Sequence, residues 1–260
     1  MHATGSMLPG SLCKMKRWNK PHLPPLIQPH DRTQLLKIAP NFVFLSKLVA
    51  GGNLRLGEYV GKLICVIGNK GGTGKTSITH MLCHGFGLLG MRSIAVLTDT
   101  SREPLFRGDR GYTPLDGRTP DQLEKILAKM ETMPEWIAVI DGGANRPEMD
   151  KQLYEIANLA LLPFRDSHED IRTVRHDLES FPAAYGVPSQ WPKNPWQQMA
   201  AEHTLDELMQ DYRPRLLEPV YTVSSSKLLL ETKVPHDLPT VLNNVCRGLA
   251  KQALSKLESE

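Results

Sequence analysis

The chain has 260 residues, a formal net charge of +3 and 40% hydrophobic residues. This length is enough for one large domain with a sizeable core, and no run of roughly 18 apolar residues predicts a membrane-spanning helix. The four cysteines form no CxxC pair. Because this spacing suits neither a zinc site nor a disulfide framework, a reducing cytoplasm is the expected compartment.

The first 60 residues differ in charge from the rest of the chain. They hold eight Lys or Arg against two acidic residues, so this segment carries +6 while residues 61–260 carry −3. Its proline-rich run "KPHLPPLIQPHDR" predicts extended or disordered chain. Such a segment fits an arm for nucleic acid or an acidic partner, but a solvated tail is favoured, because no interleaving of aromatic and basic residues supports a binding surface. We therefore expect a basic, partly disordered N-terminal extension over 1–60 and a main domain over 61–260.

From Lys62 onward the pattern is regular. The run "KLICVIG" (62–68) is continuously apolar and rich in β-branched residues, which predicts a buried parallel strand. Further strands are expected at 92–99, 135–143, 158–163 and 216–223, and helices at 76–90, 119–130, 149–157, 167–181, 197–212 and 239–257. Residues 186–196, with three prolines, are expected to form a loop. The alternation predicts an α/β fold with a mostly parallel sheet flanked by helices on both faces.

Two of these helices have clear start signals. Thr119 is the expected N-cap of the helix that has Pro120 at its first position. Ser167 is the expected N-cap of the 167–181 helix, with Asp170 three residues on as a loose capping box.

A glycine-rich loop stands between the first strand and the first helix. Residues 69–76 read N-K-G-G-T-G-K-T, which matches G-x-x-x-x-G-K-[ST] at Gly74, Lys75 and Thr76 but has Asn69 in place of the first glycine. The glycines allow backbone N–H groups to point inward at phosphate oxygens, and the helix N-terminus favours an anion. In this motif the lysine bridges the β- and γ-phosphates, and the hydroxyl binds Mg²⁺.

The stretch K-G-G-T-G-K-T at 70–76 resembles the deviant Walker A motif of the ParA/MinD family of P-loop ATPases, and the resemblance is best over 62–182. It implies a P-loop NTPase fold of the ParA/MinD type, ATP and Mg²⁺ as ligands, and an ATP-dependent homodimer. By this resemblance Lys70 reaches across the dimer to the partner's ATP phosphates. Thr76 then matches the Mg²⁺ ligand, and Ser77 lies near the α-phosphate.

Two aspartates end neighbouring strands of the predicted sheet. Phosphoryl transfer needs acidic groups that hold Mg²⁺ and place the attacking water. Asp141 ends "WIAVID" and resembles the Walker B aspartate, which acts through a Mg²⁺-bound water. Asp99 ends "SIAVLTD" and fits the first aspartate of the family's D-x-D switch. The second falls on Ser101, which carries no charge, so hydrolysis is expected to be slow or to use another group.

The segment "DGGANRPEM" (141–149) occupies the place of the second switch. Gly142 and Gly143 would let it approach the γ-phosphate, and Arg146 is either a contact to phosphate or partner or a surface residue. Tyr221 to Val223 resemble the family's adenine-holding loop. Catalytic roles are thus expected for Lys70, Lys75 and Asp99, nucleotide binding for Gly71, Gly72, Thr73, Gly74, Lys75, Thr76, Ser77, Asp141 and Gly143, and metal binding for Thr76, Asp99 and Asp141.

Three functions fit this resemblance. The first is a ParA-type ATPase, with weak hydrolysis stimulated by an adaptor protein, that positions or partitions cargo such as plasmid or chromosomal DNA. The second is an accessory ATPase of conjugation or DNA transfer, and the third is an ATP-binding switch with little or no hydrolysis. Binding to non-specific DNA would bring nucleoid association. The candidate phosphate contacts are Arg213, Arg215, Lys227, Lys233, Arg247 and Lys251. Membrane binding is not expected, because the apolar stripe of the last helix is typical of packing on its own core.

Overall fold

The computed structural model describes residues 61–100 and 105–258. The predicted N-terminal extension over 1–60 and the departure at Ser101 lie outside these residues.

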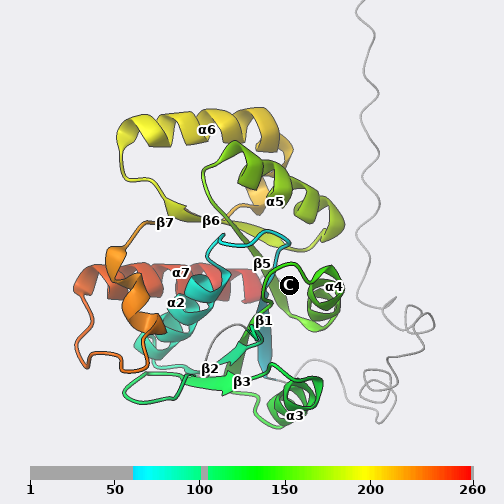
Figure 1. Cartoon of the computed structure of the whole chain (residues 1–260), viewed down its shortest axis with the longest axis vertical. Coiled ribbons are helices and arrows are strands. Elements are labelled where there is room, and N and C mark those ends of the chain that lie inside the picture. The colour runs from blue at the N-terminus through cyan, green and yellow to red at the C-terminus, as the bar shows by residue number, and fades with distance from the viewer. Residues whose placement is uncertain (1–60, 101–104, 259–260) are drawn as a thin grey trace, which may run out of the picture. The chain divides into compact units, whose positions relative to one another are not determined.

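The sheet has seven strands in the order β3-β2-β4-β1-β5-β6-β7, and all of the strand pairings are parallel (Figure 1). The strands are β1 (Lys62–Val66), β2 (Arg92–Leu97), β3 (Thr113–Asp116), β4 (Trp136–Asp141), β5 (Leu159–Phe164), β6 (Tyr185–Trp191) and β7 (Val220–Tyr221). The central strands are continuous apolar runs because both faces of a parallel sheet are buried. The predicted α/β fold with a parallel sheet is confirmed.

Helices cover both faces of this sheet. One face packs against α2 (Lys75–Leu88), the 3₁₀ helix η4 (Ser224–Leu230) and α7 (Thr240–Glu258). The other face packs against α3 (Pro120–Met130), α4 (Pro147–Ile156), α5 (His168–Ser180) and α6 (Pro195–Met209), after which the chain continues in η3 (Gln210–Arg215). None of the helices in the described part is long and apolar enough to cross a membrane.

The predicted packing of the last helix is confirmed. Leu242, Leu249, Ala253 and Leu257 of α7 are buried in the same core cluster as α2. The two helices meet at Gly85, where an added Cβ would lie 2.8 Å from Ala250 Cβ. A glycine at this point therefore permits α7 to approach α2 closely, so that the apolar stripe of α7 packs against the domain.

Both predicted caps are confirmed. The Thr119 hydroxyl accepts from the Gln122 N–H at 3.3 Å, and the Ser167 hydroxyl accepts from the Asp170 N–H at 3.1 Å.

The prediction of a loop at 186–196 is wrong, because Tyr185–Trp191 form strand β6. Pro188 is tolerated there since it pairs only with the last residue of β5, Phe164, and is not one of the residues that pair with β7. Its missing N–H therefore costs the ladder little. Strand β7 has two residues instead of the predicted eight, and β3 was not expected, because four residues containing Pro114 give no clear strand signal.

Candidate functional site

The glycine-rich loop joins β1 to α2 at the edge of the sheet where the parallel strands have their carboxyl ends (Figure 1). Gly72 and Gly74 have φ angles of 77° and 97°. Residues with a side chain rarely adopt such backbone angles, so glycine is required at these two positions for the curl of the loop. Gly74 is the N-cap of α2, and a Cβ on it would lie 3.2 Å from Ser189 Oγ of β6. The loop is therefore set both by its own backbone and by the end of β6.

The side chain of Lys75 lies buried across this loop. Its Nζ donates to the carbonyl oxygens of Gly68 at 2.8 Å and Lys70 at 2.7 Å. Burial lowers the pKa of Lys75, and the nearby carboxylates of Asp150 and Asp141 oppose this change. A cation held by loop carbonyls at a helix N-terminus is placed where phosphate oxygens would bind.

Two buried carboxylates accept hydrogen bonds from Gly68 and Asn69, where the loop leaves β1. Asp150 Oδ2 of α4 accepts from the Gly68 N–H at 3.0 Å. Asp177 of α5 accepts from the Asn69 N–H at 3.3 Å through Oδ2 and from Asn69 Nδ2 at 2.8 Å through Oδ1. Asn69, which replaces the first glycine of the strict motif, is therefore an anchor for the loop.

The sequence interpretation missed both carboxylates. A signal was present, since Asp177 falls in the apolar stripe of its helix with Ile171, Val174 and Leu178, all buried. An aspartate on the core side of a helix needs a hydrogen-bonding partner, and here that partner is the phosphate loop.

Lys70 is at the rim of the loop and is paired within its own chain. Its Nζ lies 2.6 Å from Asp170 Oδ1 and 3.1 Å from Glu169 Oε2, both at the start of α5. The hydrogen bond to Asp170 raises the pKa of Lys70. The side chain that the resemblance assigns to a partner's ATP thus binds an internal carboxylate in this structure.

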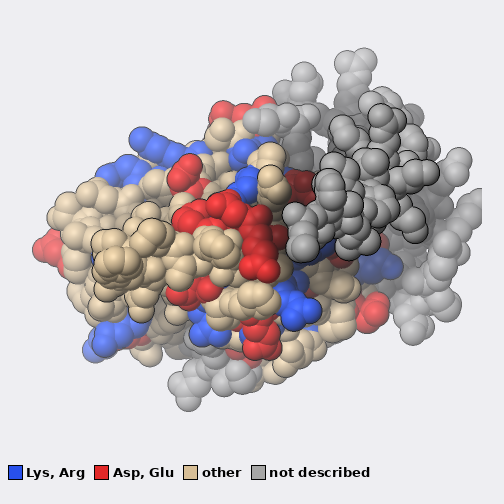
Figure 2. All heavy atoms as spheres, turned by 90° about the horizontal axis from the view of Figure 1, so that it is seen from above, with Lys and Arg blue, Asp and Glu red and all other residues tan. Residues whose placement is uncertain are grey.

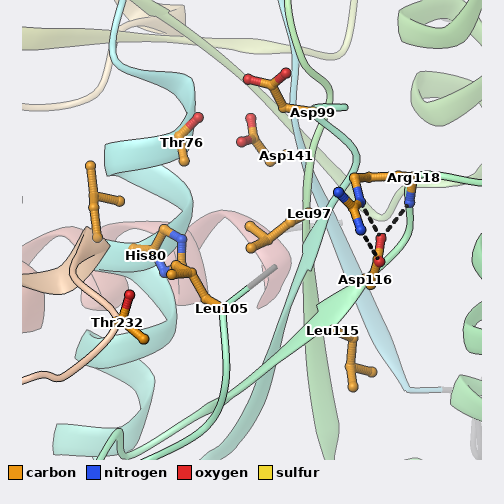
Figure 3. Close-up of a pocket in the computed structure, with 11 residues that line it drawn as sticks. Thr76, His80, Leu97, Asp99, Leu105, Leu115, Asp116, Arg118, Asp141 and Thr232 are labelled. Atoms are coloured by element: carbon orange, nitrogen blue, oxygen red, sulfur yellow. Dashed lines mark hydrogen bonds and ion pairs between the residues drawn. The ribbon is translucent and has the colours of Figure 1, made fainter. Parts of the chain in front are cut away.

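Thr76, Asp99 and Asp141, the three predicted metal-binding residues, line one cavity of about 270 Å³ (Figure 3). Asp141 ends β4 at the level of Leu97 in β2, and its carbonyl accepts from the Thr98 hydroxyl at 2.6 Å. The structure therefore places these three residues around one cavity, and their role in metal binding stays a prediction. Within the described ranges there is no group of three or more His, Cys, Asp or Glu side chains that could hold a metal ion.

The segment after β4 contacts both the loop and Thr98, the residue that follows β2. The Asn145 N–H donates to Asn69 O at 3.3 Å, and Arg146 Nη1 donates to Thr98 O at 2.9 Å. Gly143 has a φ angle of 73° and is buried. These contacts connect the segment to the start of the phosphate loop and to the residue that follows β2.

The end of β6 and the residues after β7 complete the surroundings of the loop. The Ser189 hydroxyl donates to Thr73 O, and the Thr222 hydroxyl donates to Gln190 O at 2.9 Å. Tyr221 is 40% exposed beside them. The segment that we expect to hold adenine is thus connected to the loop through two neighbouring residues of β6, Gln190, which accepts from Thr222, and Ser189, which donates to the loop.

Two candidate DNA contacts have other roles in the fold. The Arg215 guanidinium donates to the carbonyls of Leu178, Phe181 and Ala184 around the end of α5. Arg213 pairs with Glu202 and Asp206 of α6. The guanidinium groups of both arginines are engaged in holding α5 and α6.

The seven-stranded parallel sheet, with the glycine-rich loop between β1 and α2, has the fold of solved P-loop ATPases of the ParA/MinD type. Among solved structures, the chain is similar to Cyanothece McdA in complex with ATP (13% identity, TM-score 0.53, covering 75% of this chain and 97% of that one). It is also similar to the Pyrococcus furiosus cell division ATPase MinD (15%, 0.52, 75% and 99%) and to pNOB8 ParA bound to nonspecific DNA (13%, 0.54, 77% and 100%). No family model and no curated protein matches the chain. At these identities the likeness concerns the fold.

Proposed function

We propose that this chain is an ATP-dependent, dimerising ATPase of the ParA type that positions or partitions cargo. The observation that carries the proposal is the glycine-rich loop with Lys75 buried across it and a second lysine, Lys70, at its rim. The ParA/MinD fold supports it.

ATP binding follows from the residues of the loop. The N–H groups from Gly71 to Thr76 surround the phosphates, and Lys75 exchanges its two carbonyl contacts for β- and γ-phosphate oxygens. The Thr76 hydroxyl and the carboxylates of Asp99 and Asp141 would hold Mg²⁺, Asp141 through a water, because hydroxyl and carboxylate oxygens are the donors that suit this ion. The ion supplies charge neutralisation at the phosphates.

Dimerisation depends on Lys70 in this proposal. It leaves Asp170 and Glu169 and contacts the nucleotide of a second copy, so ATP and the carboxylates compete for one ammonium group. Two copies then meet through the sheet edge that holds both loops.

DNA is the proposed surface for the dimer, and an adaptor protein is the proposed trigger of hydrolysis. Figure 2 views the molecule from the side of α6, and acidic side chains gather on this face. Helix α6 itself carries Glu202, Asp206 and Glu207, which are partly or fully exposed. Phosphates would therefore bind away from this face. With Arg213 and Arg215 engaged in the fold, the exposed lysines Lys227, Lys233 and Lys251 are the better candidates.

The test is size-exclusion chromatography with light scattering of the wild type and of Lys70→Ala, each with ATP, ADP or no nucleotide. We expect an ATP-dependent dimer for the wild type and a monomer for Lys70→Ala, whereas Lys62→Ala, at the exposed start of β1, should behave as wild type. Equal dimerisation of all three proteins would contradict the role of Lys70. Salt dependence of DNA binding, measured with the same proteins, tests the DNA surface.

A non-hydrolysing switch is the second candidate, and the serine at position 101 favours it. Phosphate release measured with ATP, DNA and cell extract separates the two. A protein that dimerises with ATP and releases no phosphate under any condition is a switch.

A further inference from the structure

The cavity that is lined by Thr76 and Asp141 extends to Asp116 at the end of β3 (Figure 3). Leu97 of β2 pairs with Asp141 of β4 on one side and with Asp116 of β3 on the other. Residues paired across parallel strands project to the same face of the sheet. Asp116 and Asp141 therefore both project toward the face covered by α2, where Thr76 lies.

Asp116 forms a two-pronged ion pair with Arg118. Arg118 Nε donates to Oδ1 at 2.8 Å and Nη2 donates to Oδ2 at 2.6 Å, while the Arg118 N–H also donates to Oδ1 at 3.1 Å. The two side-chain hydrogen bonds fix the plane of the guanidinium against the carboxylate, and the backbone hydrogen bond holds the carboxylate itself. These hydrogen bonds from Arg118 hold the pKa of Asp116 below its usual range, so Asp116 orients the arginine and is a poor proton acceptor.

Arg118 differs in charge from the other residues that line the cavity. Of the described residues that line the cavity, Arg118 is the only lysine or arginine, and it shares the cavity with the carboxylates of Asp99, Asp141 and Asp116. Leucines make up much of the remaining lining: Leu97, Leu105, Leu115 and Leu230. An oriented cation in a partly apolar cavity interacts more strongly with an anion than a cation on an open surface does.

We propose that Arg118, positioned by Asp116, binds the terminal phosphate of the nucleotide held by the phosphate loop. This inference rests on the proposed function and assigns that site a second cation, supplied within the same chain and distinct from Lys75. In hydrolysis, a water oxygen bonds to the terminal phosphorus, the bond from this phosphorus to the bridging oxygen breaks, and the proton of the water passes to a phosphate oxygen. Arg118 stabilises the negative charge on the phosphate during this exchange.

The test compares the affinities of the non-hydrolysable triphosphate AMPPNP and of ADP, each with Mg²⁺, by isothermal titration calorimetry. For Arg118→Ala we expect AMPPNP to bind about tenfold or more weakly and ADP to change less than about twofold, since a charge-assisted hydrogen bond to the terminal phosphate is lost. Arg118→Gln should give the same pattern. Arg175→Ala, which breaks the exposed pair with Glu179 on α5, is the matched control and should leave both affinities unchanged.

Asp116→Asn tests the positioning role. It should weaken AMPPNP selectively but less than Arg118→Ala does, and the double variant should be no weaker than Arg118→Ala alone, because Asp116 acts through Arg118. Equal losses for AMPPNP and ADP, or no loss, in both Arg118 variants would overturn this inference while the proposed function stands. A wild type that binds neither nucleotide would overturn the proposed function and the inference together.

Discussion

Lys70 Nζ and Asp170 Oδ1 are 2.6 Å apart, and the carboxylate of this pair is fully buried. Asp170 also accepts from Arg165 Nε at 3.0 Å and from the Ser167 hydroxyl at 2.8 Å. Burial raises the pKa of Asp170, but the hydrogen bonds from Lys70, Arg165 and Ser167 outweigh it and bring the pKa to about 2. The first lysine of the loop is therefore held at the start of α5 by a carboxylate that stays ionised.

Weakening this hold should make dimerisation easier. Glu169→Gln removes the exposed outer partner of Lys70 and leaves the buried Asp170 in place. Because an exposed ion pair is a weak interaction, we expect half-maximal dimerisation at a lower ATP concentration, by roughly fivefold at most, measured by light scattering. Glu179→Gln, on the same helix and paired with Arg175, should leave the midpoint unchanged. A midpoint that is unchanged or raised for Glu169→Gln would mean that the pair does not oppose dimer formation.

Asp150 should make the stability of the domain depend on pH. Burial raises its pKa to about 6, and Lys75 and Arg146 oppose this change while Asp177 adds to it. The folded state therefore binds more protons than the unfolded state between about pH 4 and 6, so stability falls as pH rises through this window and is level above it. Above this window the ionisation of Asp150 lowers the free energy of unfolding by roughly 3 kcal/mol.

The variant Asp150→Asn keeps an acceptor for the Gly68 N–H and removes the ionisation. Urea unfolding at a series of pH values should show that the decline between pH 4 and 6 is smaller in the variant than in the wild type. If both proteins lose the same stability across this window, another group is responsible for it.

Asn69 should contribute to stability although the strict phosphate-loop motif has glycine in its place. In Asn69→Gly the amide that donates to Asp177 at 2.8 Å is lost, which should lower the free energy of unfolding by about 1–3 kcal/mol. The isosteric Asn69→Asp places a second carboxylate beside Asp177 and should cost more at pH 8 than at pH 4. Urea unfolding at both pH values measures this, and a loss for Asn69→Asp that does not change with pH would exclude the charge repulsion.

The elements that could be predicted are those whose signals are local. Strand β1 and helix α2 follow from a continuous apolar run and from a glycine-rich turn, and the cap at Thr119 follows from the residue type and Pro120. The fold class needs only the alternation of such elements. The position of Asp99 and Asp141 beside Thr76 follows from one rule, that parallel strands have their carboxyl ends at one edge.

The parts that could not be predicted depend on contacts between distant segments. Strand β3 has four residues and exists because it pairs with β2, so Asp116 gave no sign that it lies near the loop. The contacts of Asp150 with Gly68 and of Asp177 with Asn69 join residues 82 and 108 positions apart. The apolar stripe of α5 indicates that Asp177 needs a hydrogen-bonding partner. Which segment supplies that partner depends on how α4 and α5 dock, and the local pattern contains no information about that.

The packing of α2 on α7 should be the feature of the fold most sensitive to a single methyl group. In Gly85→Ala the new Cβ would lie 2.7 Å from the carbonyl carbon of Cys246 and 2.8 Å from Ala250 Cβ. Since both helices are packed in the core, the clash should lower the free energy of unfolding by about 1–3 kcal/mol or more, seen as a lower melting temperature.

Gly248→Ala on α7 is the matched control, because an added Cβ there meets nothing within 4 Å. Alanine in an exposed helix interior should raise stability by about 0.5–1 kcal/mol relative to glycine. Equal melting temperatures for the two variants would mean that α7 does not pack on α2 at Gly85 in solution.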